Sequence, residues 1–464
     1  MDKKAILAQV NAFLAENKEN IIQDIADVVA VRSVSEKNTN CPPFGEGCRE
    51  VLDIFLNKAN AMGLSTKDYD GYCGTVEIGS GEKEIGIFAH LDVVPEGNGW
   101  LRDPFKATIE DGYIFGRGVM DDKGPAVAGL YTLKCLHDLG FNLKNRVRLF
   151  AGLSEETGME CIDYYLTKEK ASDFAFTPDA DFPVCIGEKG ILGILLESEK
   201  TSGNIVDFYG GAVSNMVADR ATVVLKKGVA VPALDDRFDV EETADGTKIT
   251  AKGVSSHAAY PAKGINAIHM LAKMLIENGL VSDSEKTALN DIVSILNDCN
   301  GAGLGIAFED EPSGKLTHIV GKASYKDGVI TLDSNIRYPV TLDSELLKTS
   351  LYKKVEEYSF TVTKYEDSKP TYIPADSPIV TALMDVYKEV TGDKDAKPYT
   401  MGGGTYARHL PNAVAFGPEM PNAVLPGAPE RGGVHMPDEV ASIQQILDSI
   451  RIYVLAVLFV DELL

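Results

Sequence analysis

The chain has 464 residues, of which 45 are lysine or arginine and 69 are aspartate or glutamate, so its formal net charge is −24. Hydrophobic residues make up 44% of the chain and charged residues 25%, which is typical of a soluble globular protein and excludes a disordered one. Phosphate backbones and anionic membranes repel so acidic a surface, and we therefore expect neither a nucleic acid nor a membrane as partner.

The N-terminal 30 residues carry apolar side chains at helical spacing with acidic residues between them, which predicts a helix and not a signal peptide. The seven cysteines are scattered and never spaced as CxxC, a pattern typical of reduced thiols in the cytoplasm. Near the other end, the apolar run 452–460 is too short to span a bilayer and is expected in a buried helix. These features predict a cytoplasmic protein.

Strand-like and helix-like segments alternate over roughly the first 180 residues. Short apolar runs at 85–89, 146–153 and 173–177 predict strands, and residues 125–139 have the periodicity of a helix. Strands separated by helices favour βαβ units, in which helices cover both faces of a mostly parallel, twisted sheet. We therefore predict an α/β fold for this part of the chain.

The pattern changes between about residue 185 and residue 370, where antiparallel strands and helices are both indicated. The predicted strands are 221–227, 247–252 and 329–336, and the predicted helices are 266–278 and 284–296. Helix and strand then alternate again, with elements at 377–391, 413–416 and 438–464. We predict one discontinuous domain, residues 1–185 and 374–464, interrupted by an inserted α+β domain, residues 186–373.

Acidic residues and a histidine follow three of the predicted strands. His90 and Asp92 follow the first, Glu155 and Glu156 the second, and Asp179 the third. In open α/β sheets, ligands bind beyond the carboxyl ends of the strands. Carboxylates that converge there repel one another unless a cation lies between them, and a donor set of carboxylates and imidazoles suits zinc, cobalt or manganese.

The spacing of these residues suggests different tasks. In an extended segment His90 and Asp92 lie on the same side, so Asp92 could orient the imidazole from the ring nitrogen opposite a metal. Glu155 and Glu156 point apart, so one could bind a metal while the other serves as a general base. Taken alone, however, such a glutamate pair is also typical of a solvated turn.

Other candidate residues lie outside these strand ends. Asp121 and Asp122 immediately precede the predicted helix at 125–139. His257 and His435 lie in loops rich in glycine and proline, where functional histidines are more common than in helices. The remaining histidines are interpreted as structural: His137, His269, His318 and His409.

Two further features allow two interpretations each. The triple glycine 402–404 lacks the ending of a P-loop, so it either lets the backbone approach a small ligand or forms a tight turn. Arg337 ends a predicted apolar strand, where a half-buried cation either forms an ion pair or binds an anion. Both alternatives stay open at this point.

Several motifs occur together in an order that resembles the co-catalytic zinc peptidase family of aminoacylase, acetylornithine deacetylase and carnosinase. They are HLDVVP at 90–95, WxxDPF at 100–105, GRGVMDDKG at 116–124, SEETG at 154–158, SH at 256–257 with GxNA at 264–267, and His435. The resemblance covers nearly the whole chain. Within the family, the segments 177–191, 210–221, 334–339 and 401–408 are most similar to the bacterial dipeptidase V (β-Ala-Xaa dipeptidase) type.

This resemblance implies a di-zinc peptidase, in which cobalt or manganese can replace zinc and the inserted domain serves as a lid. Asp121 is chosen over Asp122 as the bridging acid because the family's bridging acid lies two residues before the lysine of this motif, here Lys123. The implied metal ligands are Asp121 as the bridge, His90 with Asp179 for one zinc ion, and Glu156 with His435 for the other.

The same resemblance implies tasks in catalysis and substrate binding. These are orientation of His90 by Asp92, general base catalysis by Glu155, oxyanion stabilisation by His257, and binding of the substrate carboxylate by Arg337, with Asn215 and Gly403 nearby. The expected activity is hydrolysis of unblocked dipeptides by a monomer, and cleavage of β-alanyl dipeptides stays open. The alternative is an N-acyl amino acid deacylase or a carboxypeptidase on the same scaffold.

Overall fold

The computed structural model describes residues 2–37, 40–421, 423–428 and 430–464. The chain divides into two compact units. Unit 1 comprises the chain up to Ile186 together with Ile373–Tyr399 and Gly404–Leu464, and unit 2 comprises Gly187–Tyr372 and Thr400–Gly403. The sequence prediction assigned all of 374–464 to the first domain, whereas Thr400–Gly403 cluster with the inserted unit.

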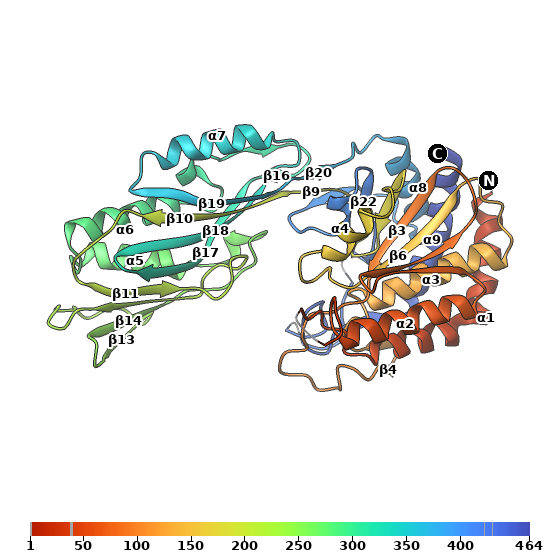
Figure 1. The fold of residues 1–464 in the computed structure, drawn as a ribbon, viewed down its shortest axis with the longest axis horizontal. Helices are drawn as coiled ribbons and strands as arrows, with labels where there is room; N and C mark the ends of the chain where they lie inside the picture. The colour runs from red at the N-terminus through yellow and green to blue at the C-terminus, as the bar shows by residue number, and fades with distance from the viewer. Residues whose placement is uncertain (1, 38–39, 422, 429) are drawn as a thin grey trace. The chain divides into compact units, whose positions relative to one another are not determined.

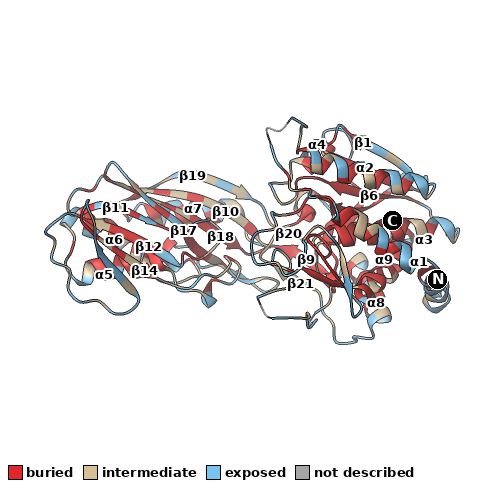
Figure 2. Cartoon of the chain, turned by 90° about the horizontal axis from the view of Figure 1, so that it is seen from below, coloured by how far each residue is buried: buried red, intermediate tan, exposed pale blue. Residues whose placement is uncertain are grey.

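The sheet of unit 1 has the strand order β1-β2-β6-β3-β7-β22-β9. Its central strands β6, β3, β7 and β22 are parallel, and the pairs on either side of them are antiparallel. Every residue of β3 is buried, which explains the continuous apolar run at 85–89. The neighbouring strand β6 is likewise buried over most of its length (Figure 2). The bounds are β1 (Ser65–Tyr69), β2 (Cys73–Ile78), β3 (Glu84–His90), β6 (Arg146–Gly152), β7 (Phe174–Thr177), β9 (Cys185–Glu188) and β22 (Ala413–Ala415).

Helices cover both faces of this sheet. Consecutive residues of a strand point to opposite faces, so Leu149 and Phe150 of β6 mark the two sides. Gly129 of α3 lies so close to the first face that an added Cβ would stand 2.9 Å from Leu149 Cδ1. On the second face, the ring of Tyr165 in α4 packs edge-on against Phe150 with a centroid distance of 5.0 Å. The bounds of these helices are α3 (Lys123–Asp138) and α4 (Glu160–Leu166).

The remaining helices of unit 1 extend the layer that contains α3 (Figure 1). Helices α1 and α9 pack against α3, α2 packs against β1 and β2, and α8 packs against α9. Their bounds are α1 (Lys3–Val29), α2 (Glu46–Ala61), α8 (Pro378–Thr391) and α9 (Ile443–Leu463). Short strands complete the unit: β4 (Thr108–Glu110), β5 (Tyr113–Phe115), β8 (Ala180–Asp181), β23 (Pro418–Glu419) and β24 (Val440–Ser442). Strand β21 (Tyr399–Met401) begins in unit 1 and ends in unit 2.

Helix α9 contains the apolar run 452–460 and forms part of the core of unit 1. By length and composition it could cross a membrane, but 78% of its most apolar window is buried inside the protein, as in a core helix. The sequence prediction placed one element at 438–464, but Val440–Ser442 near its start form strand β24 and pair with β5. The helix starts only after Ser442, whose hydroxyl accepts a hydrogen bond from the backbone N–H of Gln445.

Unit 2 is an antiparallel sheet with the strand order β13-β14-β12-β11-β17-β18-β10-β19, on which helices pack. Alternate residues of β10 are buried, as expected for a sheet with one face against a core. The strands of this sheet are β10 (Gly190–Ser198), β11 (Ile205–Gly210), β12 (Arg220–Leu225), β13 (Phe238–Glu242), β14 (Thr247–Lys252), β17 (Thr317–Lys326), β18 (Val329–Tyr338) and β19 (Phe360–Ser368). Outside it, β15 (Glu309–Asp310) pairs with β16 (Gly314–Lys315), and β20 (Thr371–Tyr372) pairs with β9. The helices are α5 (Ala267–Glu277), α6 (Asp283–Ile295) and α7 (Ser344–Val355).

The predicted fold class is confirmed. Unit 1 is an α/β unit with a sheet between two helical layers, and unit 2 is an α+β unit inserted into it in sequence. Within the first sheet, parallel pairing is confined to the central strands, and β8 and β23 form a separate parallel pair.

Candidate active site

The candidate metal ligands of unit 1 lie where elements begin or end. Strand β3 ends at His90, Glu156 follows β6, and Asp179 follows β7. Because β6, β3 and β7 are parallel neighbours, their carboxyl ends meet at one edge of the sheet. Asp121 precedes α3, and His435 lies in the loop before β24. The structure brings these five residues together.

Asp121 lies at the centre of this cluster. Its Oδ1 is 2.9 Å from Nε2 of His90, and its Oδ2 is 2.9 Å from Nε2 of His435. Each histidine has a further carboxylate beside it: Asp179 Oδ2 is 3.9 Å from His90 Nε2, and Glu156 Oε1 is 3.0 Å from His435 Nε2. The two oxygens of one carboxylate therefore face two different histidine–carboxylate pairs.

The donor atoms are close enough to share a cation. Ligand atoms of His90, Asp121 and Glu156 all lie within 4.8 Å of one another, and so do those of His90, Glu155 and Asp179. Imidazole nitrogens and carboxylate oxygens are donors that zinc, cobalt and manganese accept, so the residues present fit a divalent metal. The second group contains Glu155, which the sequence prediction assigned to proton transfer and not to metal binding.

The cluster is acidic, and its carboxylates are largely shielded from water, whereas His435 is exposed. Burial raises the pKa of Asp179 well above its usual range, and the charges of Asp121 and Glu155 add to this effect. Burial also raises the pKa of Glu155, and the charges of Glu156 and Asp121 contribute. Burial opposes the charged forms of Asp121 and His90 as well, but hydrogen bonds lower the pKa of Asp121 and raise that of His90. A divalent cation would relieve the repulsion among these carboxylates.

Asp92 holds the segment that carries the two glutamates. Its carboxylate oxygens accept the backbone N–H groups of Glu155 and Glu156, each at 3.1 Å. The Nδ1 atom of His90 is 2.9 Å from the backbone carbonyl oxygen of Asp92 and 3.5 Å from its carboxylate. The sequence prediction gave the carboxylate the task of orienting His90. In the structure the carbonyl oxygen is the nearer acceptor, and the carboxylate fixes the glutamates.

The predicted substrate-binding residues of unit 2 form a cluster of their own. Arg337, near the end of β18, donates from Nη1 to the carbonyl oxygen of Gly402 at 3.1 Å. Gly402 packs against the segment that carries His257, since an added Cβ would stand 2.9 Å from the Cβ of Ala259. This close approach explains the glycine, and Gly403 follows it in the same loop.

His257 and Asn215 are connected through the backbone. The N–H of Ala258 donates to the carbonyl oxygen of Asn215 at 2.9 Å. Burial, followed by the charge of Arg337, lowers the pKa of His257, so its imidazole is neutral near pH 7. The residue Asn215 is exposed, and in the described part of the chain only its backbone connects it to this cluster.

Comparison with known proteins identifies the family. Residues 86–458 match the sequence model of "Peptidase family M20/M25/M40". The chain belongs to this peptidase family. "Putative dipeptidase YtjP" of Bacillus subtilis (strain 168) is 36% identical over 460 residues, which are 95% of this chain and 97% of the relative. A Staphylococcus epidermidis protein with a similar name is 31% identical over 463 residues, again 95% of this chain and 97% of the relative.

The predicted peptidase family is thus confirmed as M20, and the chain is a metallopeptidase. Solved structures agree in fold. Human carnosine dipeptidase 1 superposes with a TM-score of 0.60 at 14% identity, covering 98% of this chain and 99% of the other. The M20 metallo-carboxypeptidase Sso-CP2 of Sulfolobus solfataricus gives 0.56 at 19% identity, covering 96% and 99%. The dipeptidase V type stays a prediction.

Sequence reasoning missed one carboxylate beside this M20 site. Glu439 is fully buried, and its carboxylate accepts the backbone N–H of Asp121 at 3.2 Å. It also forms an ion pair with the buried Arg117, at 2.6 Å. The sequence does contain a signal for this residue, since Glu439 is an acidic residue at the start of the apolar segment that follows His435. A charge in a buried segment is costly unless it is paired, so a partner for Glu439 could have been expected.

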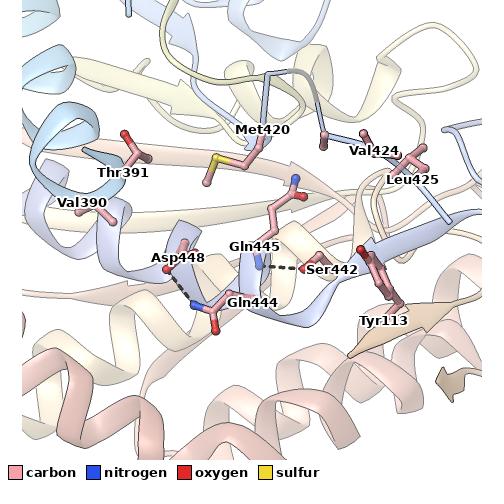
Figure 3. A pocket seen from close by; sticks show the side chains of 11 residues that line it. Tyr113, Val390, Thr391, Met420, Val424, Leu425, Ser442, Gln444, Gln445 and Asp448 are labelled. Atoms are coloured by element: carbon pink, nitrogen blue, oxygen red, sulfur yellow. Dashed lines mark hydrogen bonds between the residues drawn. The ribbon is translucent and has the colours of Figure 1, made fainter. Parts of the chain in front are cut away.

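A separate pocket of unit 1, of about 440 Å³, lies between α8, the start of α9 and the loop after β23 (Figure 3). Met420 and Leu425 line it from the loop, and Gln445 and Asp448 line it from α9. None of the described residues that line this pocket is a candidate metal ligand or catalytic residue of the peptidase.

Proposed function

We propose that this M20 peptidase is a dipeptidase that hydrolyses unblocked dipeptides with the help of two divalent metal ions, zinc first among them. The observation that carries the proposal is the position of Asp121, whose two oxygens face His90 and His435 separately. The names of the curated relatives support a dipeptidase. The resemblance to the dipeptidase V type points the same way.

The proposed ligands follow from the distances within the cluster. His90 and Asp179 would hold one ion, Glu156 and His435 the other, and Asp121 would bridge both. When bound, such a pair of ions lowers the pKa of water and polarises a carbonyl group. Cobalt or manganese would serve in place of zinc, because each accepts the same oxygen and nitrogen donors.

Glu155 is the proposed general base. The hydrogen bond from its backbone N–H to Asp92 fixes the position of the residue, and Glu156 on its other side is assigned to the metal. Its carboxylate takes a proton from the attacking water as the water oxygen bonds to the peptide carbonyl carbon. The same proton then goes to the leaving nitrogen as the carbon–nitrogen bond breaks, so the products are two amino acids.

The cluster of unit 2 supplies the proposed contacts to the substrate. His257, neutral near pH 7, would donate a hydrogen bond to the developing oxyanion. Arg337 would bind the C-terminal carboxylate, with Asn215 and Gly403 as further contacts, and a guanidinium suits this task because it binds carboxylates in bidentate fashion. Because the two clusters belong to different units, the proposed reaction requires both units to engage one substrate molecule, with unit 2 acting as the lid.

A panel of substrates tests this proposal. Free dipeptides, β-alanyl dipeptides, N-acetyl amino acids and N-blocked dipeptides are assayed with the full chain, before and after treatment with a chelator and after zinc is restored. We expect hydrolysis of free dipeptides that is lost with the chelator and recovered with zinc. A preference for N-acetyl amino acids or for N-blocked dipeptides would instead assign a deacylase or a carboxypeptidase to this scaffold.

Two further proposals concern the setting of the enzyme. We propose that it acts as a monomer in the cytoplasm, because the inserted unit is large and the cysteines have the pattern of reduced thiols. Light scattering at micromolar concentration is expected to give a mass near 50.1 kDa, and a stable dimer would contradict the monomer.

A further inference from the structure

We infer that Glu439 is a positioning residue of the metal centre, on which the binding of the ion assigned to Glu156 and His435 depends. Its carboxylate holds the loop that carries Asp121 against the segment that carries His435. The inference rests on the proposed function, because it concerns the two-metal site named there.

The side chain of Glu439 organises the loop before α3. Its Oε1 accepts the backbone N–H of Met120 at 3.0 Å and that of Asp121 at 3.2 Å. The N–H of Gly118 points at both oxygens, at 3.1 and 3.2 Å. Three N–H groups of one short loop thus converge on a single carboxylate, and the last of them belongs to the proposed bridging residue itself. Charge-assisted hydrogen bonds of this kind are stronger than neutral ones and fix the backbone that donates them.

The burial of this carboxylate is compensated. Glu439 is 0% exposed and Arg117 is 1% exposed, and Arg117 Nη1 lies 2.6 Å from Glu439 Oε2. The guanidinium also lies over the ring of Trp100, 5.2 Å from its centroid. A buried carboxylate is costly unless its oxygens are paired and hydrogen-bonded. The ion pair and the backbone donors together meet this requirement.

The backbone of Glu439 belongs to the segment that carries His435. The N–H of Gly432 donates to Pro437 and the N–H of Val440 donates back to Gly432, each at 3.0 Å, which closes the turn around His435. The carbonyl oxygen of Glu439 accepts the N–H of Gly116, also at 3.0 Å. One residue therefore joins this turn to the Asp121 loop through both its main chain and its side chain.

The two proposed ions depend on this connection to different extents. The ion assigned to Glu156 and His435 depends on Glu439 in two ways. The backbone N–H of Asp121 donates to the carboxylate of Glu439, and His435 lies in the turn that the backbone of Glu439 joins to the Asp121 loop. For the other, His90 and Asp179 are placed by β3 and β7, and only the bridge is shared. Residues that support metal ligands in this way typically change metal affinity about 10- to 100-fold when they are replaced. We expect the loss of affinity mainly at the ion assigned to Glu156 and His435.

The test replaces Glu439 by glutamine in the full chain. Glutamine has nearly the same shape as glutamate, but an NH2 group replaces one of the carboxylate oxygens. This NH2 group would face either the loop N–H groups or Arg117, which are themselves donors. Metal affinity is measured by competition between the protein and a chromophoric chelator for Co²⁺, and metal content is measured after desalting. We expect two ions per wild-type chain, and in E439Q one ion of unchanged affinity and one bound about 10- to 100-fold more weakly.

Glu285→Gln is the matched control. Glu285 lies in unit 2, is 0% exposed, and likewise accepts three backbone N–H groups, from Asn204, Ile205 and Ser282, at 2.7–2.9 Å. A general loss of stability lowers the melting temperature of both variants, but only E439Q should lose metal affinity. Glu439→Asp, which keeps the charge beside Arg117, is measured in parallel in case E439Q does not fold, and is expected to show a smaller loss of the same kind.

The outcomes separate this inference from the function on which it rests. If the wild type binds two ions and the Glu439 variants bind both with wild-type affinity, Glu439 is only a structural residue and the inference is wrong. If the wild type itself binds fewer than two ions, the two-metal proposal fails first.

Discussion

The two clusters of candidate residues differ in how their charge is balanced. In unit 1, four carboxylates and two histidines gather at the carboxyl ends of the parallel central strands, and the pKa values of Asp179 and Glu155 are raised by burial and by their neighbours. In unit 2, the cation Arg337 donates a hydrogen bond to the glycine loop and lowers the pKa of His257. The donors of unit 1 thus suit cations, and the cluster of unit 2 is the proposed site for an anionic group of the substrate.

We therefore expect that a substitution or treatment can disable one cluster and leave the other intact. Metal removal and substitutions at the sheet edge should act on unit 1 and leave the contacts of Arg337 intact. Substitutions of Arg337 or His257 should change substrate use while the metal content stays that of the wild type.

The largest effect is expected for Glu155→Gln. Loss of the general base should lower kcat about 10²- to 10⁴-fold, because proton transfer is then left to bulk water. Metal content should stay at the wild-type value, because Glu155 is assigned to proton transfer. Steady-state kinetics on a free dipeptide and elemental analysis of the same sample measure both quantities.

Glu160→Gln is the control for this substitution, since Glu160 lies nearby in sequence at the surface, in an ion pair with Lys37. It should leave both quantities unchanged. A loss of metal from Glu155→Gln would place Glu155 among the ligands, as its proximity to His90 and Asp179 allows, and would contradict the assigned base.

A smaller effect is expected for Arg337→Met in unit 2. Hydrogen bonds to charged groups contribute about 1.5–3 kcal/mol, so kcat/KM for free dipeptides should fall roughly 10- to 100-fold. Dipeptide amides, which lack the carboxylate, should be hydrolysed by the variant about as well as by the wild type. Metal content should not change.

Arg237→Met is the matched control, because Arg237 is an exposed arginine of the same unit that pairs with Asp235. It should leave kcat/KM unchanged for both kinds of substrate. An equal fall for acids and amides in Arg337→Met would mean that the side chain supports the loop at Gly402 and does not recognise the carboxylate.

The two clusters also differ in how far the sequence predicts them. The ends of apolar runs place His90 and Asp179 at one sheet edge, because parallel strands separated by helices share that edge. The motif resemblance adds Asp121, Glu156 and His435, and their distances are those expected of ligands around a shared bridge. Local sequence suffices for His90 and Asp179, because each adjoins a strand that is itself predictable.

Other features depend on contacts between segments that are distant in sequence. The hydrogen bond from Arg337 to Gly402 joins a strand to a loop that returns from much later in the chain. The buried pair of Arg117 and Glu439 likewise joins two segments far apart. The start of the last helix was misplaced because Val440–Ser442 pair with β5, and a short apolar run by itself does not distinguish a strand from a helix.

The smallest and most local effect concerns the titration of His257. Burial and then the positive charge of Arg337 disfavour the imidazolium, and the pKa of His257 therefore lies below its ordinary value. In Arg337→Met the second cause is removed while burial stays, so the pKa should rise and still remain below the ordinary value. Histidine resonances followed by NMR against pH, with His257→Gln to assign the signal, measure the midpoint in each variant.

The same titration in chelator-treated protein tests the separation of the clusters directly. The midpoint of His257 should not change without metal or substrate, because the groups that shift its pKa all belong to unit 2. If the midpoint of His257 is the same in Arg337→Met as in the wild type, the charge of Arg337 does not affect the pKa of His257. A midpoint that follows the metal would show that the acidic cluster acts on His257 even without substrate, and the two clusters would then have to be treated as one electrostatic site.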